Sequence, residues 1–272
     1  MKVGKMLNHQ GYTDIVNTLP LINYYLKTYD RVDMLVREEV TGMINYYLQQ
    51  FDGAATVTYG PIHIVDGGPS KWSDIFSINP TDDILFTGCH DQHRTDKYKN
   101  NFEIREREKN NHGLGMDNPD SWWHRGGFLE AFYTTYDIDY IERIDSFNLR
   151  RDHDLESKLY KKFKANHCTG DYVLVHEDVA RDVRVVTKPP SPNIKSFNLN
   201  QSSCTFFDFI QILINAKEMP MIDSSWAAVC YLLDCKFGLF KNIPITITCL
   251  PPRDYHNMFT SPKELDNWFI RP

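Results

Sequence analysis

The segment EMPMIDSSWAAVCYLLDC, at residues 218–235, decides the fold of this chain. A short apolar run at 219–222 precedes three polar residues, and the run at 226–233 then has scarcely a polar side chain. This pattern predicts a buried strand, a tight turn and a buried helix. The polar residues of the turn are Asp223, Ser224 and Ser225.

The predicted turn combines polar side chains with the start of a helix. Backbone N–H groups without an intrahelical partner and the positive end of the helix dipole meet there, and both attract phosphate. One interpretation is therefore that Asp223, Ser224 and Ser225 contact the phosphates of a ligand. The alternative is that Asp223 or Ser224 serves only as the N-cap of the helix.

Composition limits the kind of protein this can be. With 272 residues and 42% hydrophobic content, the chain can form one large domain or two of ordinary size. Acidic residues outnumber basic ones by 36 to 30, and Lys and Arg form no long block, so we expect no nucleic-acid partner. The sequence contains neither a long apolar stretch nor a signal-peptide core, so we expect no transmembrane segment. Six cysteines without a CxxC pair fit a reducing, cytoplasmic location.

The first half of the chain alternates strand patterns with helix patterns. This alternation predicts a parallel sheet with right-handed crossovers. Pro20 marks a kink or break in the first helix. Strands are expected at 2–7, 31–36, 55–59 and 83–87, and helices after residue 14 and at 41–50. Ligands of such sheets bind beyond the carboxyl ends of the strands, which places there His9, Gln10, Asp14, His90, Asp91 and His93.

The second half repeats the alternation after a charged middle. Thr205 and Asp208 have capping-box spacing at the start of a helix, and Ser261-Pro262-Lys263-Glu264 predicts a final helix at 261–270. The helix after Thr205 has an apolar face at helical spacing, made of Phe206, Phe209, Ile210, Leu213 and Ile214. Pro220 cannot donate to a sheet ladder, so the register of the 219–222 strand stays open. Further strands are expected at 171–175, 183–187, 194–197 and 245–249, and a helix at 152–164. We therefore predict an α/β protein with two strand-and-helix domains, 1–150 and 151–272.

Three segments carry a resemblance to a known family. They read NHQGYTDIVNTLPLINYY, RRDHDLESKLYKKF followed by DYVLVHEDVAR, and FFDFIQILINAKEMPMIDSSWAAVCYLLD. The chain resembles a family of mostly uncharacterised glycosyltransferase-like proteins of bacteria and large DNA viruses, whose members are similar to GT-B enzymes. The resemblance implies two Rossmann-like domains facing across a cleft. It also implies that the final helix, 261–270, crosses back to pack on the N-terminal domain.

The resemblance further implies that the second domain holds a sugar nucleotide and the first an acceptor. Arg181 would make forked hydrogen bonds to phosphate oxygens and so stabilise the departing nucleoside diphosphate. The donor-binding residues would be His176, Glu177, Asp178, Arg181, Lys188, Asp223, Ser224 and Ser225.

The loop at residues 9–14 supplies the candidate general base. Transfer with inversion needs a carboxylate or imidazole to take a proton from the acceptor hydroxyl, and Asp14 and His9 offer one each. The alternatives are that Asp14 is an acid of the first helical turn and that the imidazole of His9 bonds to backbone. Gln10, Tyr12 and His90 are the candidate acceptor-binding residues.

Two Asp-x-Asp sequences raise a metal-dependent alternative. GT-A glycosyltransferases hold Mn²⁺ or Mg²⁺ with an Asp-x-Asp motif, and this pattern occurs at Asp137-Ile138-Asp139 and at Asp152-His153-Asp154. The first lacks a preceding apolar strand, and the second opens a charged helix where acids are expected. We therefore expect no metal ligands and no resident cofactor, and we favour a metal-independent site over one with a divalent metal.

We predict a hexosyl- or pentosyltransferase that moves a sugar from a nucleoside-diphosphate donor to a hydroxyl of a glycan or glycoprotein. The resemblance makes UDP-sugars, UDP-xylose among them, the first donors to try, and a viral member would act in the host cytoplasm. Two alternatives stay open. One is a non-catalytic nucleotide- or glycan-binding protein of the same fold, and the other is a metal-dependent GT-A enzyme.

Overall fold

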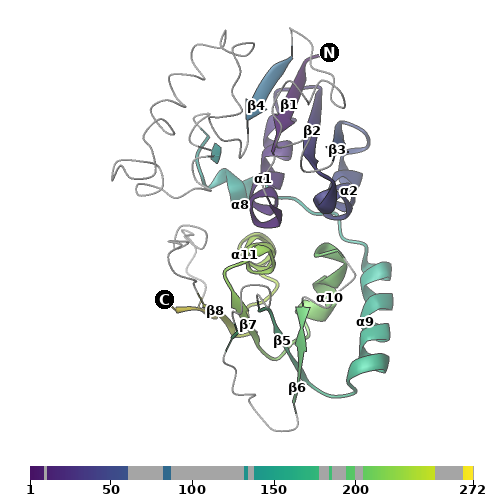
Figure 1. Ribbon diagram of the computed structural model, residues 1–272, viewed down its shortest axis with the longest axis vertical. Coiled ribbons are helices and arrows are strands. Elements are labelled where there is room, and N and C mark those ends of the chain that lie inside the picture. Colours follow the sequence, from purple (N-terminus) through teal and green to yellow (C-terminus); the bar gives the residue numbers. More distant parts are fainter. Residues whose placement is uncertain are drawn as a thin grey trace. The chain divides into compact units, whose positions relative to one another are not determined.

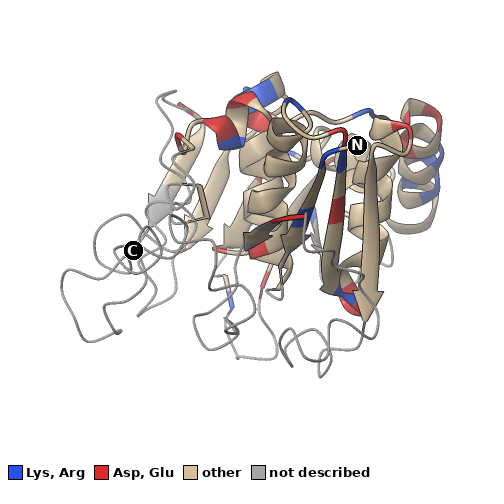
Figure 2. Ribbon diagram, turned by 90° about the horizontal axis from the view of Figure 1, so that it is seen from above, with Lys and Arg blue, Asp and Glu red and all other residues tan. Residues whose placement is uncertain are grey.

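The computed structural model describes residues 1–8, 11–60, 82–86, 132–133, 138–177, 184–185, 194–199, 205–248 and 266–271. The chain divides into two compact units, Met1–Leu149 and Arg150–Pro272, each built around parallel strands (Figure 1). Lys and Arg are mixed with Asp and Glu over the described helices and strands (Figure 2). Within the described part of the chain, no helix has the length and apolar character needed to cross a bilayer.

The first unit contains a four-stranded parallel sheet. Its strands are β1 (Val3–Leu7), β2 (Arg31–Arg37), β3 (Ala55–Gly60) and β4 (Asp83–Phe86), in the order β3-β2-β1-β4. Each neighbouring pair is parallel, which confirms the sheet predicted from the alternating pattern. The sheet grows in one direction from β1 to β3 and in the other from β1 to β4. Ligands of open α/β sheets bind at such a reversal.

The first helix, α1 (Tyr12–Tyr25), runs through Pro20 without a break, so of the two outcomes expected there, a kink or a break, the break is not found. Proline removes one backbone hydrogen bond from a helix and crowds the carbonyl four residues earlier. Burial offsets this cost, since every residue of α1 from 15 to 22 is buried. α2 (Thr41–Leu48) lies between the short turns η1 (Glu38–Val40) and η2 (Gln49–Phe51) and connects β2 to β3.

A short helix, α8 (Glu142–Asp145), packs on α1 near the end of the first unit. Arg143 is 1% exposed, and its Nη1 donates to Asn17 Oδ1 at 3.0 Å. The hydroxyl of Tyr133 donates to the carbonyl of Asn17 at 2.5 Å. The Arg143 guanidinium also lies over the ring of Tyr140, 4.4 Å from its centroid. Buried polar groups of α1 are therefore satisfied by residues more than a hundred positions later.

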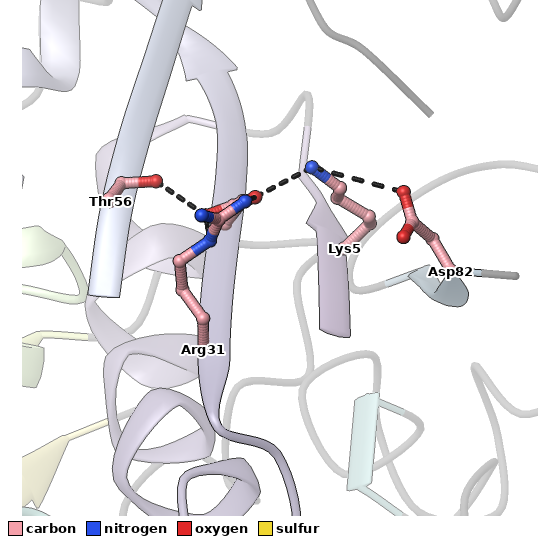
Figure 3. A network of polar contacts seen from close by, with 5 residues as sticks. Lys5, Arg31, Thr56 and Asp82 are labelled. Carbon is pink, nitrogen blue, oxygen red and sulfur yellow. Dashed lines mark hydrogen bonds and ion pairs between the residues drawn. The ribbon is translucent and has the colours of Figure 1, made fainter. Parts of the chain in front are cut away.

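A buried charge network crosses the strands of the first sheet (Figure 3). Lys5 on β1 and Asp33 on β2 are register partners, and Lys5 Nζ lies 2.6 Å from Asp33 Oδ2. Thr56 Oγ1 on β3 donates to Asp33 Oδ1 at 2.6 Å, and Arg31 Nε lies 2.9 Å from the same oxygen. Asp82 Oδ2, just before β4, is 4.0 Å from Lys5 Nζ. Burial raises the pKa of Asp33, but the hydrogen bonds from Lys5, Thr56 and Arg31 together outweigh it and hold that pKa below its usual range.

The described residues of the second unit form five parallel strands. They are β5 (Tyr172–Val175), β6 (Lys195–Asn198), β7 (Met219–Ile222), β8 (Ile245–Thr248) and β9 (Trp268–Arg271). β5 pairs with β6, and β7, β8 and β9 form a continuous ladder. Two bridges, Val173 to Glu218 and His176 to Met221, join β5 to β7. The spatial order is therefore β6-β5-β7-β8-β9.

Pro220 explains why β5 and β7 meet in bridges instead of a full ladder. Leu174 N donates to Glu218 O and His176 N donates to Pro220 O, both at 3.1 Å. In a parallel ladder the backbone nitrogen of residue 220 would donate back to β5 between these two bonds, and proline has no hydrogen there. Ile222 N resumes the pattern by donating to His176 O at 3.1 Å. The strand therefore runs through Pro220 over its expected residues, 219–222, and loses one bond.

The helices of the second unit are α9 (His153–His167), α10 (Ile210–Leu213) and α11 (Ser225–Phe237), with a 3-10 turn, η7 (Phe207–Phe209), leading into α10. Asp152 caps α9 by accepting from Leu155 N at 2.9 Å. α11 is buried from Trp226 to Cys235, as its apolar sequence predicts, and ends at Gly238 in the left-handed conformation. The strand expected at 183–187 is not found at its described residues, Arg184 and Val185.

The end of the chain differs from the prediction. Trp268–Arg271 forms the strand β9 of the second unit, in parallel register with β8, where the sequence predicted the end of a helix at 261–270. The start of that predicted helix, 261–265, lies outside the described residues. Helix-start signals are local, whereas β9 is held by partners far away in the chain.

Asp234 in α11 provides the contact that holds β9. It is 3% exposed, its Oδ2 accepts from Trp268 Nε1 at 2.8 Å, and its Oδ1 accepts from Phe240 N at 2.8 Å. The Trp268 ring also meets Tyr231 edge to face, with centroids 5.5 Å apart. Asn267 Nδ2 adds bonds to the carbonyls of Phe240 and Ile243. One buried carboxylate thus fastens both the loop after α11 and the C-terminal strand.

We expect Lys5→Met to lower the free energy of unfolding by about 3 kcal/mol, because it leaves the Asp33 carboxylate buried without its lysine. Lys2→Met, which removes an exposed ion pair with Asp83, is the control and should cost about 0.5 kcal/mol or less. Because the folded-state pKa of Asp33 is lowered, its contribution is complete above about pH 4 and is lost as the pH falls through that pKa. Urea titrations at several pH values measure both effects. Equal costs for the two variants would contradict the role of the network.

We expect Asp234→Ala and Trp268→Phe to be coupled in stability. Asp234→Ala should cost about 3 kcal/mol, since it removes two hydrogen bonds to a buried carboxylate, and Trp268→Phe about 2 kcal/mol. If the indole bond is the link, the double variant should lose clearly less than the sum of the two single losses. Chemical denaturation of the four proteins gives this coupling energy, and strict additivity would show that β9 is held in another way.

Candidate functional site

The candidate site of the second unit lies where the growth of its sheet reverses. β6 adds to one side of β5, and β7, β8 and β9 add to the other. The carboxyl ends of β5 and β7 are therefore neighbours at the reversal, about 4.8 Å apart. The sequence-predicted residues His176 and Glu177 follow β5, and Asp223 and Ser224 follow β7.

His176 and Asp223 lie on the same face of this sheet. His176 bridges Met221, and Asp223 is two residues beyond Met221 in a backbone that still bonds to β8 through Asp223 N and Thr248 O at 3.2 Å. Residues that alternate by two share a face. Tyr172 shares the face as well, and its hydroxyl donates to the carbonyl of Ile212 in α10 at 2.6 Å. His176 and Asp223 are each 8% exposed, so the structure brings an imidazole and a carboxylate together near the edge on the α10 side.

Ser224 forms the turn from β7 into α11. It is the N-cap in extended conformation, and its side chain accepts from Ala227 N at 3.4 Å. Ser224 is therefore an N-cap, which is one of the two roles expected for it. This role is compatible with anion binding, because the cap uses one N–H, and the N–H groups of Ser225 and Trp226 have no carbonyl four residues earlier inside the helix. Ser224 and Ser225 are half-buried.

Glu177 has a structural task in addition to its predicted donor role. Its Oε1 accepts from Val185 N at 3.2 Å, its Oε2 accepts from Asn198 Nδ2 at 3.3 Å, and Arg184 Nη1 lies 3.8 Å from Oε2. These contacts fasten the segment after β5 to the end of β6. Val185 in turn packs with Val173, Val175 and Ile222 in the core on the other face of the sheet.

In the first unit, the loop after β1 is anchored at both sides. Asn8 is 1% exposed, its N donates to Leu35 O at 3.1 Å, and its Nδ2 donates to Thr18 Oγ1 at 3.1 Å. The sequence interpretation did not single out Asn8, although its place directly after a buried strand was a signal. Asp14 lies in the first turn of α1 and is half-buried, which is the helix-acid position named as its alternative.

Tyr12 begins α1 and is 39% exposed. Its hydroxyl donates to the carbonyl of Glu39, in the turn after β2. Burial, followed by the nearby Glu39 carboxylate, raises the pKa of Tyr12, so the phenol stays protonated at neutral pH and can donate a hydrogen bond. The structure thus places Tyr12 and Asp14 together at the carboxyl edge of the first sheet.

The remaining predicted residues lie outside the described part of the chain. This holds for the candidate base His9, for the acceptor residues Gln10 and His90, and for the donor residues Asp178, Arg181 and Lys188.

The Asp-x-Asp sequences have local structural roles where they are described. Asp152 is the N-cap of α9 and Asp154 lies in its first turn. Asp139 Oδ1 accepts from Ile141 N at 3.0 Å in an exposed turn, while Asp137 is outside the described residues. Among the described residues, no group of three or more His, Cys, Asp or Glu side chains is placed to hold a metal ion.

The arrangement of strands is shared with a known enzyme. The structure of a family 9 glycosyl transferase from Veillonella parvula DSM 2008 covers 99% of this chain and 86% of its own length, with a TM-score of 0.55 and 8% sequence identity. The chain has the GT-B fold. This finding confirms the predicted fold class, and the GT-B fold argues against the GT-A alternative.

Two other solved structures show a weaker likeness to this GT-B chain. The iron-containing dodecameric glycosyltransferase TibC from enterotoxigenic E. coli H10407 covers 97% of the chain and 64% of its own length, with a TM-score of 0.48 and 10% identity. The E. coli heptosyltransferase WaaC with ADP covers 99% and 92%, with a TM-score of 0.40 and 12% identity. No protein-family model and no curated protein sequence matches the chain. The resemblance to a family of bacteria and large DNA viruses therefore stays a prediction.

Proposed function

We propose that this chain is a glycosyltransferase that transfers a sugar from a nucleoside diphosphate to a hydroxyl of a glycan acceptor. The observation that carries the proposal is the turn Asp223-Ser224-Ser225, which joins β7 to α11 beside the end of β5, at the reversal point of the second sheet. In open α/β folds this is the place for phosphate-containing ligands. The GT-B fold agrees with this role.

The donor diphosphate binds, in this proposal, at the start of α11. Backbone N–H groups of Ser225 and Trp226 face the phosphate oxygens, and the helix dipole favours the two negative charges. Arg181 and Lys188, in the segment after β5, neutralise the charge that develops when the nucleoside diphosphate departs. His176 and Asp223 lie at the same edge of the sheet, and Glu177 accepts from the N–H of Val185, which lies between the two cations in the sequence.

The acceptor binds, in this proposal, at the carboxyl edge of the first sheet. Asp14 or His9 takes the proton of the acceptor hydroxyl while its oxygen attacks the anomeric carbon of the donor. The bond from that carbon to the phosphate oxygen breaks, and the electron pair leaves with the nucleoside diphosphate. Tyr12, Gln10 and His90 bind the acceptor, and the phenol oxygen of Tyr12, whose hydrogen is donated to the carbonyl of Glu39, accepts from a sugar hydroxyl. UDP-sugars, including UDP-xylose, are the first donors we propose to try, without an added metal.

We expect Ser224→Ala to weaken nucleoside-diphosphate binding about tenfold, since it removes the cap that shapes the phosphate turn. The matched control is Asp152→Ala, which removes the N-cap of α9. Each change should cost about 1 kcal/mol of stability. Isothermal titration of both variants with UDP, ADP and GDP separates a binding role from a folding role. Absence of binding by the unmodified protein, or equal affinities in both variants, would contradict the proposal.

We expect Asp14→Asn to lower sugar transfer at least a hundredfold, while the affinity for the nucleoside diphosphate stays unchanged, because general-base catalysis contributes about 10²- to 10⁴-fold. Asp154→Asn, which removes an acid from the first turn of α9, is the control for helix-dipole effects and should keep its turnover. If Asp14→Asn keeps full turnover, His9→Gln is the remaining variant for the base. A protein that binds donor but neither transfers nor hydrolyses it would be the non-catalytic alternative.

A further inference from the structure

Three aromatic side chains meet where η7 and α11 begin. The ring centroids of Phe206 and Trp226 are 4.6 Å apart at an interplanar angle of 88°, and those of Phe209 and Trp226 are 5.7 Å apart at 62°. Trp226 is 5% exposed, while Phe206 and Phe209 are half-buried. The indole therefore forms the buried backing of a partly open aromatic surface, which we call the Phe206 platform (Phe206, Phe209 and Trp226).

The backbone under the Phe206 platform is fixed by the predicted capping box. Thr205 N and Oγ1 both donate to Asp208 Oδ2, at 3.2 and 2.7 Å, and Asp208 N donates to Thr205 Oγ1 at 3.4 Å. These reciprocal bonds enclose Phe206. Because the turn that follows is 3-10, Phe207 is the residue that points into the core, with 0% exposure. The apolar face predicted from helical spacing, with Phe206 and Phe209 in it, is therefore rotated, and these two rings are left half-buried.

The platform lies beside the proposed diphosphate site. Trp226 directly follows Ser225, so the backing indole and the phosphate-facing N–H groups belong to one helical turn. The Phe206 ring contacts that indole, so only the Trp226 side chain separates it from the same helical turn. α10, which continues from Phe209, lies over the face of the sheet that also carries His176 and Asp223, as the Tyr172 to Ile212 bond shows. Polar groups suited to phosphate and an aromatic surface thus adjoin at one edge.

We propose that the Phe206 platform stacks the nucleobase of the donor, an inference that rests on the proposed function. A nucleoside diphosphate has a charged end and a flat aromatic end, and the edge of this sheet offers a counterpart to each. A rigid ring held by a capping box and backed by a buried indole loses little conformational freedom on binding. Phenylalanine presents no hydrogen-bonding group, so the platform contributes affinity to every base and more to the larger purines, while base identity must be read elsewhere.

The test compares Phe206→Ala with Phe163→Ala by isothermal titration. Phe163 is also half-buried and sits in another aromatic cluster of the second unit, 5.0 Å from both Tyr172 and Phe197. ADP and UDP probe base and phosphates together, and inorganic pyrophosphate probes the phosphates alone. Removal of one stacking ring should weaken ADP and UDP binding about 5- to 150-fold and leave pyrophosphate unchanged. Phe163→Ala should leave all three affinities unchanged.

Two further variants keep the proposal testable if the alanine variant folds poorly. Phe206→Leu keeps an apolar side chain without a flat ring and should lose most of the same affinity, whereas Phe206→Trp should keep it. Unchanged ADP and UDP binding in both Phe206→Ala and Phe206→Leu would overturn the stacking role of the platform while the proposed function stands. A loss of pyrophosphate affinity equal to the loss of ADP and UDP affinity would do the same. Failure of the unmodified protein to bind ADP, UDP and GDP would instead overturn the proposed function, and the platform with it.

Discussion

The pairing of β5 with β7 is the interaction on which the second unit depends. It joins the pair β5 and β6 to the ladder of β7, β8 and β9, and it does so through backbone bonds on both sides of Pro220. The missing N–H of proline removes a single bond from the seam, and the bonds of His176 and Ile222 beyond it keep the strands aligned. The candidate donor site follows directly from this seam, since it forms where the two strands end.

Buried charge has a similar positioning role in each unit. In the first, the Lys5 to Asp33 pair fixes neighbouring strands in register, and Arg31 and Thr56 supply the remaining hydrogen bonds of the carboxylate. In the second, Asp234 accepts from the indole of Trp268 and from a backbone N–H. Burying such a group costs free energy, and the group fixes the structure because only a specific hydrogen-bonding partner can satisfy it. The Lys5 to Asp33 pair and Asp234 thus each fix strands of a sheet whose edge carries a candidate site.

The candidate functional groups of this chain lie near the starts of helices. The start of α11 offers backbone N–H groups for the proposed anion, the start of η7 offers an aromatic surface, and the first turn of α1 offers a carboxylate and a phenol. Each is fastened by residues that do not themselves react: Ser224 at α11, Thr205 with Asp208 at η7, and Asn8 with Thr18 at α1. This division between fixed scaffold and reacting groups is what pre-organised catalysis requires.

The sequence by itself determined the elements whose signals are local. Apolar runs marked β7 and α11, Ser224 and Asp152 were readable as caps, and the alternation of strands and helices predicted parallel sheets. Tertiary structure decided what depends on distant partners. Pro20 stays inside α1 because the residues around it are buried, and Phe207 replaces Phe206 in the core because the first turn is 3-10. Residues Trp268–Arg271 form β9 because β8 and Asp234 bind them. A helix-start signal near residue 261 carries no information about these distant partners.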